Sequence, residues 1–216
     1  MWGRRVSAAG LVAEQQLERA LRLVRHGRAL LGIVGQPGAG KSTLSAALLA
    51  ALDERGVRTA LVGMDGFHIA HRALTELGLV EIKGAPSTFD VAGYVALLRR
   101  LRDPAEDVVW APEFRREIED AIQSAVPVRA DVQLVITEGN YLLVDGPWRP
   151  VRELLDEVWY VDVPEDLRRQ RLAARHEFYG RTPDQAWERT LGSDERNART
   201  VAATKARADL VVTLDE

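Results

Sequence analysis

A glycine-rich stretch that ends in lysine and serine is the part of the sequence best suited to chemistry. Residues 35–42 read Gly-Gln-Pro-Gly-Ala-Gly-Lys-Ser, which fits the pattern G-x-x-x-x-G-K-[ST]. Glycines allow successive backbone N–H groups to curl around phosphate oxygens without clashes from Cβ atoms. The Lys41 ammonium can neutralise the outer phosphates, and the Ser42 hydroxyl can ligate Mg²⁺. The pattern therefore predicts a nucleoside triphosphate, ATP, bound together with Mg²⁺.

The elements expected on either side of this stretch favour the same interpretation. Residues 30–34 form a short, continuous apolar run that predicts a buried strand, and a helix is expected from about residue 41 to 54. A helix that begins at the loop directs the positive end of its dipole at a bound anion. The nucleotide contacts expected from this loop are Gly35, Gly38, Ala39, Gly40, Lys41, Ser42 and Thr43.

Two acidic residues follow other expected strands. Asp65 comes just after a strand at 58–64, and Glu138 follows a strand at 132–137. The carboxyl ends of parallel strands meet at one edge of a sheet, so both side chains are expected near the loop. Asp65 could accept a proton from an attacking hydroxyl, or it could cap a turn or hold a water on Mg²⁺. Glu138 could orient the water shell of the metal or the substrate, or it could pair with a cation.

Arginines gather late in the chain. Arg168, Arg171 and Arg175 recur at spacings of three and four residues, so they share one face of a helix, and Arg181 follows. Such arginines can close over phosphates and stabilise charge in the transition state of phosphoryl transfer. A solvated cationic face explains the spacing equally well. We favour Arg171 and Arg175 as catalytic residues.

The alternation of apolar strands and amphipathic helices predicts an α/β fold with a parallel sheet covered on both faces. The remaining strands are expected at 158–163 and 210–214. Helices are expected at about 11–26, 91–101, 164–178 and 183–204, with weak helical character at 113–125 and a short edge strand at 108–110. With 216 residues and no shift in composition, the whole chain, 1–216, is expected to be one domain.

Composition narrows the partners. The chain has no cysteine, which excludes disulfides and thiolate metal sites, and its four histidines do not cluster as zinc ligands. A net charge of -3, from 29 basic and 32 acidic residues, gives no basic tract for nucleic acid. No apolar run is long enough to cross a membrane, and the polar residues that follow the first five positions predict no secretion signal. A cytoplasmic protein is expected, and a homodimer is compatible with the sequence.

With these motifs in place, the chain resembles the P-loop kinases that include uridine kinase, type I pantothenate kinase and phosphoribulokinase. The resemblance spans about residues 28–214, and its parts occur in the order of that family. They are residues 35–43, 64–68, 83–90, 137–143, 161–164, 171–181 and 197–209.

The resemblance implies the P-loop NTPase fold, with a core of five parallel strands and a helical lid at about residues 168–185. It implies ATP-dependent phosphorylation of a hydroxyl on a small molecule such as a nucleoside, a pantothenate-like compound or a sugar. Asp65 would be the general base, and insertions at about 66–90 and 103–131 would lie near the acceptor. The implied substrate contacts are Asp65, His68, Lys83, Phe114, Arg116, Glu138, Asn140 and Tyr141. Further nucleotide contacts would come from Arg181, Lys205 and Arg207, and metal contacts from Ser42 and Glu138.

One departure from the family concerns the acceptor. Pantothenate kinases have Pro-x-Tyr-x-His where residues 112–116 of this chain read Pro-Glu-Phe-Arg-Arg. The Tyr and His positions are therefore Phe114 and Arg116. The arginine pair could meet an anionic acceptor, such as a sugar phosphate or a carboxylate, or it could face solvent.

The alternative is a nucleotide-binding ATPase or GTPase without small-molecule kinase activity. A GTP-dependent switch needs a guanine-reading Asn-Lys-x-Asp, whereas residues 204–207 read Thr-Lys-Ala-Arg. The joint presence of Lys41, Ser42, Asp65 and the lid arginines favours a kinase.

Overall fold

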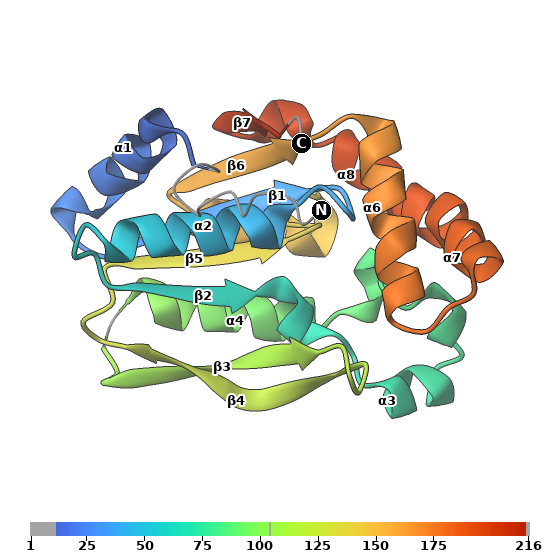
Figure 1. The fold of residues 1–216 in the computed structure, drawn as a ribbon. Coiled ribbons are helices and arrows are strands. Elements are labelled where there is room, and N and C mark those ends of the chain that lie inside the picture. Colours follow the sequence, from blue (N-terminus) through green and yellow to red (C-terminus); the bar gives the residue numbers. More distant parts are fainter. Residues whose placement is uncertain (1–11, 104, 215–216) are drawn as a thin grey trace.

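Five parallel strands form the main sheet of the computed structural model, which describes residues 12–103 and 105–214 (Figure 1). Their order is β2-β5-β1-β6-β7, and every neighbouring pair is parallel. The strands are β1 (Ala29–Gly35), β2 (Thr59–Gly63), β5 (Leu134–Gly139), β6 (Glu157–Asp162) and β7 (Leu210–Thr213). The predicted α/β fold with a five-stranded parallel sheet is therefore confirmed.

Helices cover both faces of this sheet because its central strand is apolar throughout. All seven residues of β1 are buried. Leu31 and Ile33 belong to a core cluster with α1 (Glu14–Leu23) and α2 (Lys41–Asp53). Leu30 and Val34 point to the opposite face, where they join a cluster built on α4 (Val91–Arg102) and α5 (Arg149–Leu154). The first five residues, which bear on the expectation about a secretion signal, lie outside the described residues. Residue 11, where the first helix was expected to begin, lies outside them as well.

The segment expected to be weakly helical is instead a β-hairpin, which corrects that prediction. β3 (Val108–Arg115) pairs antiparallel with β4 (Asp120–Arg129) as a separate two-stranded sheet. Val109 and Ala111 are buried while Trp110 is half-exposed, which is the period of two expected for a strand. The turn between the strands uses Glu119 at a φ of 52°, a left-handed conformation that ends any helix.

The last helical region is also more divided than its sequence suggests. Helix α6 (Glu165–Phe178) matches its prediction, but the next segment splits into α7 (Pro183–Arg189), a π-helical turn (Thr190–Asp194) and α8 (Glu195–Ala202). Helices α6, α7 and α8 stand beside the carboxyl ends of β1, β5 and β6, and α3 (His71–Glu76) lies near them (Figure 1). Single π-turns inside α-helices often occur at functional sites, and this one lies in the same group of helices.

Among the helices of the described part, none is both long and apolar enough to cross a membrane.

Candidate active site

The phosphate loop occupies the connection between β1 and α2, the position that its sequence predicts. Gly38 has a φ of 84° and Gly40, which precedes the helix, a φ of 90°. A Cβ on Gly38 would lie 2.7 Å from the backbone oxygen of Arg168. Ala39 is fully buried behind the loop, and Ser42 and Thr43 lie in the first turn of α2. Backbone conformation and close packing together explain why glycine stands at these positions.

Lys41 lies across the loop. Its Nζ donates hydrogen bonds to the carbonyls of Gly35 at 3.0 Å and Gln36 at 3.1 Å, and to Oδ1 of Asn140 at 2.8 Å. Burial lowers the pKa of the Lys41 ammonium to about 8, although the nearby carboxylates of Glu138 and Asp65 oppose this shift. A desolvated ammonium held above a loop of this kind is a binding group for an anion.

Ser42 and Glu138 form the candidate magnesium site. The Ser42 hydroxyl donates to Oε1 of Glu138 at 2.9 Å. The other oxygen, Oε2, is buried and has no hydrogen-bond partner in the described residues. Burial raises the pKa of the Glu138 carboxyl. An orphaned carboxylate oxygen beside a hydroxyl suits Mg²⁺, which takes one or two protein ligands and keeps several waters, so these residues fit the metal.

A small cavity of about 70 Å³ connects the loop with the second carboxylate. Its lining includes Lys41, Ser42 and Glu138 together with Asp65 and Arg175. The expected meeting of the phosphate loop and Asp65 at one edge of the sheet is therefore present in the fold.

Asp65 stands in a 3₁₀ turn (Met64–Phe67) that follows β2 directly. The turn packs tightly against β3, since a Cβ on Gly66 would lie 2.6 Å from the carbonyl oxygen of Pro112. Oδ2 of Asp65 lies 3.6 Å from Nη2 of Arg116, and both residues line the small cavity and a second, larger cavity of about 460 Å³. The Asp65 carboxylate thus borders both cavities.

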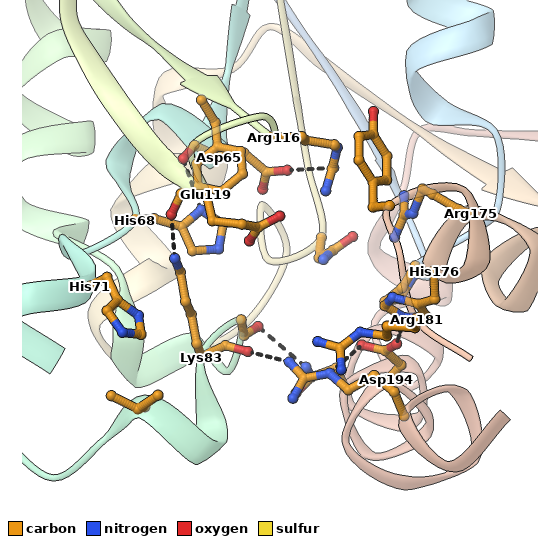
Figure 2. Close-up of a pocket in the computed structure, with 18 of the residues that line it drawn as sticks. Asp65, His68, His71, Lys83, Arg116, Glu119, Arg175, His176, Arg181 and Asp194 are labelled. Atoms are coloured by element: carbon orange, nitrogen blue, oxygen red, sulfur yellow. Dashed lines mark hydrogen bonds and ion pairs between the residues drawn. The ribbon is translucent and has the colours of Figure 1, made fainter. Parts of the chain in front are cut away.

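Aromatic rings form part of the wall of the larger cavity (Figure 2). The His68 ring lies 4.1 Å from the Phe89 ring and 4.8 Å from the Phe114 ring, measured between centroids. Burial lowers the pKa of His68, so its imidazole is neutral near pH 7. The Lys83 ammonium lies 5.6 Å from the Phe114 centroid. This wall therefore places tilted aromatic rings in the same cavity as the Asp65 carboxylate.

Four of the arginines of the predicted lid take different positions. Arg168 is fully buried and pairs with Glu165 at 2.7 Å and Glu195 at 2.6 Å, so it holds α6 to α8. Nη1 of Arg171 lies 3.8 Å from the place of a Cβ on Gly40, beside the phosphate loop. Arg175 lines both cavities, whereas Arg181, predicted as a nucleotide contact, lines only the larger one. Arg171 therefore lies at the phosphate loop, Arg181 at the larger cavity, and Arg175 at both cavities.

Three predicted contacts outside the phosphate loop do not line either cavity. Tyr141 is fully buried against Phe89 and Trp148, and its hydroxyl donates to the carbonyl of Gly84. Lys205 pairs with Asp162 at 2.6 Å. Arg207 pairs with Asp145 at 2.6 Å. Each side chain is engaged in holding neighbouring elements together. Glu138 lines the small cavity only, while Asn140 lines both.

The loop that contains Lys83 and Gly84, called the acceptor loop below, is held to the last helices by hydrogen bonds to its backbone carbonyls. The carbonyl of Lys83 accepts a hydrogen bond from Arg189 at 2.8 Å. The carbonyl of Gly84 accepts one from Asn197 at 3.2 Å, in addition to that from Tyr141. Residues of α7 and α8 thereby fix the position of Lys83 at the cavity.

The residues of the larger cavity that were not foreseen as site residues include Glu119, His176, Arg189 and Asp194. His176 directly follows Arg175 in a motif shared with the lid of the family, which was the one available signal. Glu119 was missed because residues 113–125 were expected to be helical, whereas Glu119 lies in the turn of the β3–β4 hairpin. Arg189 ends α7 and Asp194 ends the π-helical turn, which no pattern in the sequence marks.

Comparison with known proteins agrees with this geometry. The family described as methylmalonyl Co-A mutase-associated GTPase MeaB matches residues 5–69, less than a third of the chain, including the phosphate loop. A "putative uridine kinase" of Schizosaccharomyces pombe is 33% identical over 209 residues, which cover 92% of this chain and 89% of that protein. The pantothenate kinase of Yersinia pestis is 33% identical over 149 residues, which cover 64% of this chain and 46% of that enzyme.

Among solved structures, a "putative fructose transport system kinase" from Silicibacter sp. TM1040 is 36% identical, with a TM-score of 0.84, and the match covers 96% of this chain and 99% of that one. Fold and site thus define a P-loop phosphotransferase. The chain belongs to the family of small-molecule P-loop kinases that includes these uridine kinase-like and pantothenate kinase relatives.

Proposed function

We propose that this kinase transfers the terminal phosphoryl group of ATP to a hydroxyl group of a small molecule bound in the larger cavity. The observation that carries the proposal is the position of Asp65, which lines both the small cavity at the phosphate loop and the larger cavity beside it. An acceptor in the larger cavity can present a hydroxyl to this carboxylate while its oxygen faces the phosphate loop.

Different residues of the chain have different roles in this phosphoryl transfer. Lys41 and the loop amides bind the phosphates, and Asp65 takes the proton of the acceptor hydroxyl as the new oxygen–phosphorus bond forms. Arg171 and Arg175 offset the charge that spreads over the transferring group. Ser42 and Glu138 would hold Mg²⁺, which supplies neutralisation of phosphate charge when it is bound.

Arg116 supports this arrangement from the acceptor side. Its guanidinium lies 3.6 Å from Asp65 and 5.8 Å from the centre of the Phe114 ring. These two contacts hold it at the border of the cavities, where it orients the carboxylate toward an incoming hydroxyl.

The class of acceptor comes from the family. Its members act on nucleosides, pantothenate and sugars, so a compound of this size with a free alcohol is the proposed substrate. A cytoplasmic setting, with neither nucleic acid nor membrane as partner, accords with that role.

The test is acceptor-dependent formation of ADP. Purified protein with ATP and Mg²⁺ is incubated with nucleosides, pantothenate, hydroxy acids and sugars, and each reaction is scored for ADP and for a product heavier by one phosphoryl group. We expect ADP to rise only with acceptors that yield such a product. ADP release at one rate, whichever compound is added, would instead support the ATPase alternative.

A further inference from the structure

Resting on that function, we propose that the acceptor carries an anionic group, a carboxylate or a phosphate, that Lys83 and Arg181 bind. The larger cavity has a cationic lining. It contains five lysine and arginine side chains and three carboxylates. The cationic residues are Lys83, Arg116, Arg175, Arg181 and Arg189, and the acidic ones are Asp65, Glu119 and Asp194.

Internal pairing already satisfies two of the carboxylates. Asp65 lies 3.6 Å from Arg116. Oδ2 of Asp194 lies within hydrogen-bond distance of Nε2 of His176, at 2.7 Å, and Oδ1 lies 4.0 Å from Nε of Arg189. Within residues 12–103 and 105–214, no carboxylate lies within 4.0 Å of a side-chain nitrogen of Lys83, Arg175 or Arg181. These three cations face one remaining carboxylate, that of Glu119, so the excess positive charge of the cavity lies on them.

One of the three already has a function on the phosphate side. Arg175 also lines the small cavity, so it faces the transferring group. Lys83 and Arg181 line only the larger cavity. They come from separate elements, Lys83 from the acceptor loop and Arg181 from the segment between α6 and α7, and both face the hollow that Asp65 borders (Figure 2). They are therefore available to the acceptor rather than to the nucleotide.

The hydrogen-bonding capacity of both side chains exceeds what the protein uses. The Lys83 ammonium donates to the carbonyl of Glu119 and, with three protons, keeps two for a ligand. The Arg181 guanidinium can engage two oxygens of a planar or tetrahedral anion at once. A neutral acceptor would displace water from these cations without replacing its hydrogen bonds, so the lining discriminates against neutral compounds.

Matched pairs of acceptors test the proposal. The carboxylate arm compares pantothenate with panthenol and glycerate with glycerol, and the phosphate arm compares fructose 6-phosphate with fructose. We expect the anionic member of at least one pair to be preferred by about 10-fold or more in kcat/KM, because charge-assisted hydrogen bonds are stronger than neutral ones. The arm in which the preference appears identifies the anion.

Variants assign the preference to the two residues. Lys83→Met and Arg181→Met should raise KM for the preferred anionic acceptor about 10-fold with little change in kcat, because the contact is made equally before and during transfer. Arg149→Met, at an exposed arginine outside both cavities, should change neither constant.

The outcomes separate this inference from the function on which it rests. Phosphorylation of only the neutral members, or of anionic members with KM unaltered in both variants, would overturn the anionic acceptor and leave the kinase standing. If none of the six compounds stimulates ADP formation or yields a phosphorylated product, the result counts against both.

Discussion

Oδ2 of Asp65 and Nη2 of Arg116 lie 3.6 Å apart at the border between the two cavities. The two residues reach this point by different routes, Asp65 from the turn after β2 and Arg116 from the turn of the β3–β4 hairpin. The hairpin is therefore part of the site, because it supplies the cation that faces the proposed base.

Replacement of Asp65 tests its role as the base. Asp65→Asn keeps the size of the side chain but cannot accept the proton, so we expect kcat to fall by about 10²-fold or more while ATP affinity is retained. Steady-state kinetics and an ATP titration measure the two effects. Asp53→Asn, at the exposed end of α2, is the matched control. Turnover that survives in Asp65→Asn with a good acceptor would remove Asp65 as the base.

The lowered pKa of Lys41 predicts a pH dependence of ATP binding. Without nucleotide, the ammonium loses its proton as pH rises through about 8. Bound phosphate favours the charged form, so the pKa is higher in the complex, and binding above about pH 8 must take up a proton. Affinity should therefore fall as pH rises beyond this value. Calorimetric titration in buffers of different ionisation enthalpy measures the proton uptake.

Lys41→Met is the companion measurement. It should weaken ATP binding and flatten the pH dependence, since the titrating group is gone. The same slope in this variant and in the unaltered protein would assign the proton to another group.

Arg171 should act on rate rather than on acceptor affinity. Because its guanidinium lies beside the phosphate loop, Arg171→Ala is expected to lower kcat by about 10²-fold with a small change in acceptor KM. The opposite pattern is expected for Arg181→Met, which faces the acceptor. A rise in KM with unchanged kcat in Arg171→Ala would move this residue to the acceptor side.

Arg168 should matter for stability. Its fully buried side chain pairs with Glu165 and Glu195, so Arg168→Met removes the buried partner of both carboxylates. We expect a loss of about 3 kcal/mol in the free energy of unfolding, measured by denaturant titration. Arg169→Met, which removes a more exposed partner of Glu195, should cost clearly less, because solvent screens exposed ion pairs. Equal losses in the two variants would contradict a special role for the buried pair.

Local sequence patterns were enough to predict much of this structure. The phosphate loop depends on fixed spacing within eight residues, and β1 on a continuous apolar run, so both could be predicted from the chain alone. The hairpin could not, since its strands pair residues such as Val109 and Val128 that are distant in sequence, and a polar turn resembles an exposed helix.

The candidate site divides in the same way. Asp65 was placed by its position after a strand, but the side to which Arg181 turns depends on how the segment after α6 packs. Tyr141 follows a strand as Asn140 does, yet its ring enters the core and its hydroxyl holds Gly84. Alternation along an extended chain separates such neighbours, and only the packing decides which of them faces the cavity.

The hydrogen bonds from Arg189 and Asn197 to the carbonyls of Lys83 and Gly84 have a consequence for engineering new specificities. A chimaera that imports the acceptor loop of a relative would sever these links unless the matching donors were transplanted too. Loop and C-terminal helices must therefore be exchanged as one module, and their residues should have diverged in concert.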